Sequence, residues 1–113
     1  MLKKAVLDFS RERDWLKYHN PKDLTISISL EASELLEHFQ WLTNEEVERS
    51  IKDAKEFDEI KFEIADIISY ALELSNILEI DVSETVLRKI RDNEKKYPIN
   101  RTKGHYKKYD KIS

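Results

Sequence analysis

The sequence predicts an all-α fold, and three observations support this class. The 113 residues include one glycine and two prolines, so the residues that most strongly interrupt helices are rare. Leucine, isoleucine, glutamate and lysine are abundant, and charged residues make up 38% of the chain. This composition is typical of amphipathic helices with solvated outer faces. We therefore expect a bundle of four or five helices.

The first two helices are expected over residues 2–18 and 21–41. Apolar residues recur at helical spacing in the first of them. Asn20 is a favourable N-cap, and Pro21 suits the first position of the second helix. Residues 24–30 alternate between apolar and polar side chains, as a strand would. Helix-favouring residues follow without a turn signal, so we predict a helix for this stretch.

Three further helices are expected in the rest of the chain. Residues 43–46 match the capping-box pattern and begin a short helix over about 44–52. A long helix should follow over about 54–79. Residues 81–84 form a second capping-box signature, and the helix that they begin should stop before Pro98, with a loop after it. The inner face of the long helix should consist of Phe57, Ile60, Ile64, Ile67, Ala71, Leu74 and Leu78.

Charge is distributed unevenly along the chain. Residues 1–87 carry 20 acidic and 10 basic residues, whereas residues 88–113 carry 3 acidic and 10 basic residues. We expect a helical domain over residues 1–100 and a basic tail over 101–113, which is either solvated or meets a polyanion. No apolar run is long enough to span a membrane, and charge interrupts the first residues too soon for a signal peptide. With no cysteine for disulfides or thiolate metal sites, a cytoplasmic protein is the expectation.

Two pairs of carboxylates lie within apolar stretches. Glu31 and Glu34 are three residues apart, and so are Glu63 and Asp66, so each pair shares one face of its helix. Acid pairs with the same spacing also occur within residues 45–59, but on a charged stretch that we expect, like His38, on the surface. Burial rather than spacing therefore distinguishes the two apolar pairs. Four carboxylates facing one another in an apolar interior need a compensating positive charge.

A hard divalent cation is the predicted source of that charge. Carboxylate oxygens are preferred ligands of Mg²⁺, Mn²⁺ and Ca²⁺ rather than of Zn²⁺. A di-iron bundle would need Glu-x-x-His motifs, and none of the three histidines has a glutamate three residues before it. Magnesium keeps coordination positions for water and for substrate phosphates, so such a site can activate a water beside a phosphate chain.

These acidic motifs resemble the metal-binding signature of the MazG-like superfamily, the all-α nucleoside triphosphate pyrophosphohydrolases. In that signature the two acid pairs are separated as they are here, where 28 residues lie between Glu34 and Glu63. The resemblance extends over about residues 9–98, and its other motifs are similar to those of the dCTP pyrophosphatase subgroup. These motifs are Phe9-x-x-x-Arg13-Asp14-Trp15, His19-x-Pro21-Lys22-x-Leu24, Phe39-Gln40-Trp41, Asp66-x-x-x-Tyr70 and Lys89-x-x-x-Asn93-x-x-x-Tyr97-Pro98.

The resemblance implies a Mg²⁺-dependent hydrolase, with Mn²⁺ as the other candidate cation, that cleaves (deoxy)nucleoside triphosphates between the α and β phosphates. The metal ligands would be Glu31, Glu34, Glu63 and Asp66. Glu31 or Glu34 would be the catalytic residue that positions or deprotonates the attacking water. The implied substrate-binding residues are Trp15, His19 and Trp41 around the base, Lys89, Asn93 and Tyr97 at the phosphates or sugar, and Tyr70. Relatives assemble as dimers or as dimers of dimers, so a homo-oligomer is expected.

The base that such an enzyme would prefer stays open, because two positions depart from the resemblance. Relatives often have asparagine where this chain has Asp23, and dCTP-selective enzymes have a histidine where this chain has Val6. The main alternative function is a non-enzymatic helical interaction module whose basic tail binds an acidic partner or, less favoured, a nucleic acid. A catalytically idle protein that sequesters nucleotides is a third hypothesis, against which the complete set of four acids argues. No membrane partner is expected.

Overall fold

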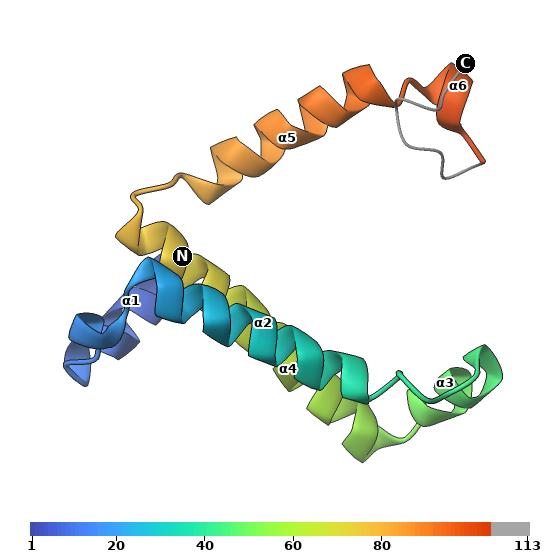
Figure 1. The fold of residues 1–113 in the computed structure, drawn as a ribbon, viewed down its shortest axis with the longest axis horizontal. Helices are drawn as coiled ribbons and strands as arrows, with labels where there is room; N and C mark the ends of the chain where they lie inside the picture. The colour runs from blue at the N-terminus through green and yellow to red at the C-terminus, as the bar shows by residue number, and fades with distance from the viewer. Residues whose placement is uncertain (105–113) are drawn as a thin grey trace. The chain divides into compact units, whose positions relative to one another are not determined.

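Helices account for all the regular secondary structure of the computed structural model, which describes residues 1–104 (Figure 1). The predicted all-α class is confirmed for these residues, and the strand-like stretch 24–30 is helical. Most of the predicted tail 101–113 lies outside the described residues. The elements are α1 (Leu2–Glu12), the 3₁₀ helix η1 (Leu16–Tyr18), α2 (Pro21–Glu37), α3 (Asn44–Ser50), α4 (Ala54–Ile77), α5 (Val82–Lys96) and α6 (Ile99–Thr102).

The chain divides into two compact units, Met1–Glu79 and Ile80–Ser113. The first unit contains α1 to α4, and the second contains α5 and α6. None of the described helices combines the length and apolar character that a membrane span requires. The division into a domain over 1–100 and a tail stays a prediction.

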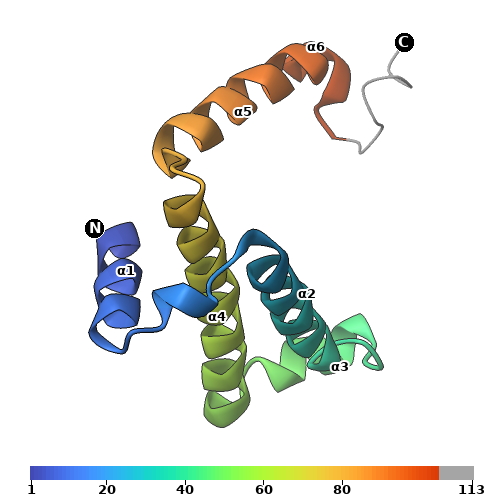
Figure 2. The same cartoon turned by 60° about the vertical axis from the view of Figure 1, so that its left-hand side comes forward.

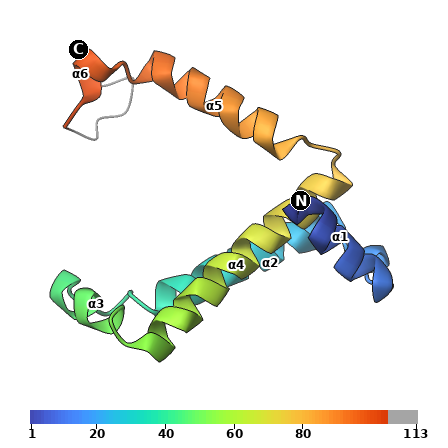
Figure 3. The ribbon, with the colours of Figure 1, turned by 180° about the vertical axis from the view of Figure 1, so that it is seen from behind.

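The first unit is organised around α4, the longest helix. α2 runs antiparallel to α4 and lies along it, as Figures 1 and 3 both show. α1 packs against the C-terminal half of α4 (Figure 2). There the Asn76 side-chain amide donates to the Lys3 carbonyl at 3.0 Å, and the Ser10 hydroxyl donates to Glu73 Oε1 at 3.1 Å.

Side-chain caps explain where most helices begin. Asn20, Asp53 and Asp81 each accept a hydrogen bond from backbone amides in the first turn of α2, α4 and α5, respectively. Thr43 and Glu46 form the reciprocal capping box that their sequence predicts at the start of α3. Each cap satisfies amide groups that have no partner within the helix, and the predicted helix starts are confirmed at these positions.

Helix ends were predicted less well, because they depend on turns. α1 ends at Glu12 rather than at residue 18, since Asp14 adopts a left-handed conformation (φ 53°), which aspartate tolerates better than most residues. α2 ends at Glu37 rather than at residue 41, since the chain turns before Thr43 adopts the extended conformation of the α3 N-cap. The loop expected after Pro98 instead contains the one-turn helix α6.

The apolar core of the single chain is small. Among the described residues, Leu24 and Ile60 are the buried apolar residues. The prediction for the inner face of α4 was correct for Ile60, and Ile67 and Leu74 are half-buried. It was wrong for four residues, because α1 and α2 cover only part of the helix surface. These four exposed residues are Phe57, Ile64, Ala71 and Leu78.

Candidate functional site

Three carboxylates from α2 and α4 meet where the two helices pack together. Ligand oxygens of Glu31, Glu63 and Asp66 all lie within 4.8 Å of one another. Glu34, on the turn of α2 after Glu31, lies close enough to raise the pKa of both Glu31 and Glu63. The antiparallel packing of α2 on α4 therefore places all four predicted metal ligands in one carboxylate cluster.

Two oxygens of the carboxylate cluster are buried and lack a partner. Glu31 Oε2 and Glu63 Oε2 are shielded from solvent and have no hydrogen-bond partner among the described residues. An unpaired buried carboxylate oxygen is costly, because it has lost its hydration without gaining a donor. A hard divalent cation fits these residues, since every candidate ligand atom is a carboxylate oxygen and two of them need a positive partner.

The pKa values of the carboxylate cluster reflect the same lack of a compensating positive charge. The pKa of Glu31 is raised to about 7. Burial is the largest cause, and the interaction with Glu34 is the next. Burial, and then the interaction with Glu34, also raises the pKa of Glu63. These carboxyl groups therefore hold protons at a pH where an ordinary glutamate is ionised, unless a cation supplies the missing positive charge.

His38 lies beside the carboxylate cluster, and its prediction as a surface residue was wrong. Its side chain is only 15% exposed. Its Nδ1 atom lies 2.5 Å from Glu56 Oε1, and its Nε2 atom lies 4.0 Å from Glu63 Oε1. The hydrogen bond with Glu56 is the main cause that raises the pKa of His38. A protonated His38 therefore places one positive charge beside the four acids.

Sequence spacing contained a signal for this contact. His38 follows Glu31 by seven residues, and Glu56 precedes Glu63 by seven residues. Residues seven apart share one face of a helix, so both belong to the faces that carry the carboxylate cluster. Glu56 is half-buried as well, which corrects its prediction as a surface residue, whereas Glu59 is exposed. Ligand atoms of His38, Glu56 and Glu59 also lie within 4.8 Å of one another.

A cavity of about 420 Å³ shares Asp66 with the carboxylate cluster. Three of the residues predicted to bind substrate line it: Trp15, His19 and Tyr70. Trp15 and His19 lie at the two ends of η1, and Tyr70 belongs to α4. An edge-to-face contact between the rings of Phe9 and Trp15, with centroids 5.6 Å apart, forms part of its wall. The full lining is Ala5, Val6, Phe9, Trp15, His19, Asp66, Ser69, Tyr70 and Glu73.

The polar residues of this cavity include one that the sequence did not reveal. Glu73 follows Asp66 by seven residues and Tyr70 by three, so the three side chains share one face of α4. Its carboxylate accepts the hydrogen bond from Ser10. Nδ1 of His19 is buried and has no hydrogen-bond partner among the described residues. Burial of Tyr70, together with neighbouring acids, raises the pKa of its phenol, so this group stays neutral and able to donate.

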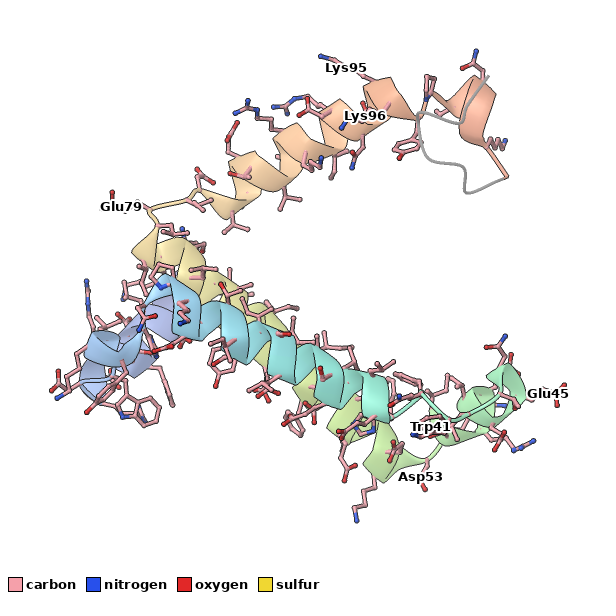
Figure 4. The ribbon with its side chains drawn as sticks, in the orientation of Figure 1. Trp41, Glu45, Asp53, Glu79, Lys95 and Lys96 are labelled. Atoms are coloured by element: carbon pink, nitrogen blue, oxygen red, sulfur yellow. The ribbon has the colours of Figure 1, made fainter. Side chains whose placement is uncertain are left out.

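Four other predicted residues do not line this cavity. Trp41 lies in the connection between α2 and α3 (Figure 4), where the residue is 85% exposed. Lys89 and Asn93 belong to α5, and Tyr97 is its C-cap, so all three belong to the second unit. There Tyr97 lines a cavity of about 470 Å³ with Glu94, Ile99 and Asn100. The functional roles of these four residues stay predictions.

The fold and the carboxylate cluster together define a helical protein with a candidate site for a hard divalent cation. Its family follows from comparison with known proteins. The model of the MazG-like family matches residues 26–112, most of the chain, and the protein belongs to this family.

Relatives with known names match nearly the whole chain. It is 31% identical over 108 residues to dCTP pyrophosphatase 1 of Bos taurus, covering 96% of this chain and 64% of that protein. For dCTP pyrophosphatase 1 of Homo sapiens the identity is 28% over 111 residues, covering 98% and 65%. The chain thus spans less than two thirds of the length of these relatives. The crystal structure of a pyrophosphatase from Archaeoglobus fulgidus is 44% identical, with a TM-score of 0.77, covering 84% of this chain and 87% of that chain.

Proposed function

We propose that this protein is a Mg²⁺-dependent nucleotide pyrophosphohydrolase, which converts (deoxy)nucleoside triphosphates to monophosphates and pyrophosphate. The observation that carries the proposal is the shared position of Asp66, which belongs both to the carboxylate cluster and to the cavity with Trp15, His19 and Tyr70. A nucleotide could therefore place its phosphates at the acids and its base among the rings. The names of the relatives, dCTP pyrophosphatase and pyrophosphatase, support this class of reaction.

The four acids would bind the metal ion, and one of them would also activate the attacking water. Glu31, Glu34, Glu63 and Asp66 would hold Mg²⁺, or Mn²⁺ in its place. When bound, the cation supplies charge neutralisation of the phosphates and acidifies a water ligand. Glu31 or Glu34 orients the attacking water and accepts its proton. The water oxygen forms a bond to one of the two phosphorus atoms that share the α–β bridging oxygen. The bond between that phosphorus and the bridging oxygen then breaks, and the bridging oxygen leaves as part of the other product.

The remaining residues would hold the substrate. Trp15 and Tyr70 offer ring faces and edges to a base, and His19 offers the unpaired Nδ1 atom as a polar contact. The second unit is basic, and α5 ends in Lys95 and Lys96 (Figure 4). On the basis of the family resemblance, Lys89, Asn93 and Tyr97 remain proposed contacts of the phosphates or sugar, and Trp41 a proposed contact of the base.

We also propose that the protein acts in the cytoplasm as a homodimer or a dimer of dimers. The single chain buries few apolar residues and leaves large ones exposed on α2 and α4, which supports self-association. Phe62, at 70% exposure, is the most exposed of them. Light scattering after size exclusion should give at least twice the mass of one chain, and Phe62→Glu should lower it. A monomer at micromolar concentration would contradict this part of the proposal.

The direct test of the activity is product analysis. Purified protein is incubated with each deoxynucleoside triphosphate and Mg²⁺, and the products are separated by anion-exchange chromatography. We expect equal amounts of monophosphate and pyrophosphate, and none with EDTA. Release of single phosphates, or turnover that does not depend on a divalent cation, would refute the proposed reaction.

A further inference from the structure

Glu73 lies in the same cavity as Asp66 but away from the carboxylate cluster along α4. The two residues are seven apart on one helix face, which separates their backbones by about 10 Å at the rise of an α-helix. This separation matches the span of a nucleotide from its 5′ phosphate to the far edge of its base. A carboxylate also repels phosphates. With the phosphates at the cluster, as the proposed function requires, Glu73 is therefore placed to meet the base.

The position of the Glu73 carboxylate is held from α1. Ser10 is fully buried, at 0% exposure, and its hydroxyl donates to Glu73 Oε1. A carboxylate can accept about four hydrogen bonds, so capacity remains for a ligand. Glu73 also lines a neighbouring cavity of about 230 Å³, which shares His19 and Val6 with the first. Glu73 thus lines both cavities.

An ionised carboxylate discriminates between the hydrogen-bonding groups of a base. It accepts hydrogen bonds and offers none. The exocyclic amino group of cytosine or adenine donates to it, whereas the carbonyl of uracil or hypoxanthine at the same ring position presents a second acceptor. Sites that hydrogen-bond a substrate donor reject analogues that lack it, because the polar group of the site is then left unpaired.

We infer that Glu73 is a specificity-determining residue that selects nucleotides whose base carries an exocyclic amino group, and that Ser10 is its positioning residue. The substrate class is therefore cytosine and adenine nucleotides in preference to uracil and hypoxanthine nucleotides. This inference rests on the proposed function, because it assumes that the cavity of Trp15 and Tyr70 receives the base.

The experiment compares pairs of substrates that differ only at this position. The ratio of kcat/KM is measured for dCTP against dUTP and for dATP against dITP. For the wild type we expect both ratios to favour the amino base by at least about tenfold, as for a hydrogen bond to a charged group. In Glu73→Gln both ratios should approach one, because an amide both donates and accepts. Unchanged ratios in this variant, or a wild type that prefers the carbonyl bases, would overturn the inference.

Two further variants separate positioning from stability. Ser10→Ala should reduce both ratios, although less than Glu73→Gln, while Glu48→Gln on the exposed side of α3 should leave them unchanged. If Ser10→Ala lowers the melting temperature but keeps the wild-type ratios, the positioning role of Ser10 is wrong. Circular dichroism checks that each variant is folded.

Failure of the inference can be told apart from failure of the proposed function. If all four triphosphates are hydrolysed equally well, the proposed function holds and the role of Glu73 is refuted. If none is hydrolysed, calorimetric titration with dCMP and dUMP still tests the cavity. Tighter binding of dCMP that is lost in Glu73→Gln supports the inference, and equal or undetectable binding of both refutes it.

Discussion

Two regions of the molecule carry acid pairs with the same three-residue spacing, but only one of them concentrates carboxylates against one another. In α3, Glu45 and Glu48 are exposed, and Figure 4 shows Glu45 at the outer end of the first unit. Between α2 and α4, by contrast, Glu31 and Glu63 are half-buried and each has an oxygen without a partner. Spacing places two acids on one helix face, and the neighbouring helix decides whether that face meets water or other acids.

Glu56 falls between these two cases. By spacing it pairs with Asp53 and Glu59 on the charged stretch, yet it is half-buried and hydrogen-bonds His38. The pairing arises because the end of α2 passes the beginning of α4. An acid of the charged stretch thus lies beside the carboxylate cluster. Four substitutions can test where the candidate site ends and the charged stretch begins.

The largest effect is expected for Glu63→Gln. It removes an oxygen ligand and a negative charge from the carboxylate cluster while preserving the shape of the side chain. We expect the Mg²⁺-dependent kcat/KM to fall by more than about 100-fold, beyond the range typical of residues that only support metal ligands. The matched control, Glu48→Gln, should retain wild-type activity. If the two variants were equally active, the acids between α2 and α4 would be no more important for activity than those of α3.

A smaller effect is expected for His38→Ala, which tests where the candidate site ends. His38 hydrogen-bonds Glu56, and its Nε2 atom lies 4.0 Å from Glu63 Oε1, so its loss should change the surroundings of Glu63. We expect the Mg²⁺ concentration for half-maximal activity to rise by about 10-fold, with a smaller change in kcat at saturating Mg²⁺. Titration of activity with MgCl₂ measures both. An unchanged Mg²⁺ requirement would show that His38 is independent of the site.

The effect of pH on stability should follow from Glu31. Its pKa is raised from 4.5 to about 7 in the folded protein. Above pH 7 it is ionised in both states, and the metal-free fold is then penalised. Below pH 4.5 it is protonated in both states and the penalty is absent. Metal-free Glu31→Gln should therefore melt about 2–5 °C above the wild type at pH 8, and the difference should vanish as the pH falls towards 4.5.

Added Mg²⁺ should reverse this order at pH 8, because binding to the folded state stabilises the wild type more than the variant. Differential scanning fluorimetry measures the melting temperatures of the wild type and the variant, first with EDTA and then with MgCl₂. A variant that is less stable than the wild type without metal would contradict the raised pKa of Glu31.

The smallest effect on catalysis is expected for Asp53→Ala. The Asp53 carboxylate accepts hydrogen bonds from the amides of Lys55 and Glu56 and so caps α4. Its removal should lower the free energy of unfolding by about 1 kcal/mol, measured by urea denaturation, and leave the Mg²⁺ requirement unchanged. A large loss of Mg²⁺ affinity would instead extend the candidate site into the charged stretch.

Features that depend on neighbouring residues were predicted well from the sequence. The helical class follows from composition, and the starts of α2, α3, α4 and α5 follow from caps that act within one helical turn. The placement of each acid pair on one helix face follows from helical geometry in the same way. The bounds of α1 and α2 were less accurate, because their ends depend on turns.

Only the tertiary structure decided which of these faces meet. Carboxylate oxygens of Glu31 on α2 and Glu63 on α4 lie within 4.8 Å of one another. Ser10 hydrogen-bonds Glu73, 63 positions further along the chain. No local pattern specifies such contacts, because they arise from the packing of α1 and α2 against α4. The sequence by itself determined the helices and the faces that carry the acids. Packing determined that two of those faces share one cluster, in which Glu31 and Glu63 are half-buried whereas Glu34 and Asp66 are exposed. It also determined that His38 lies beside this cluster and that Glu73 lines the neighbouring cavity.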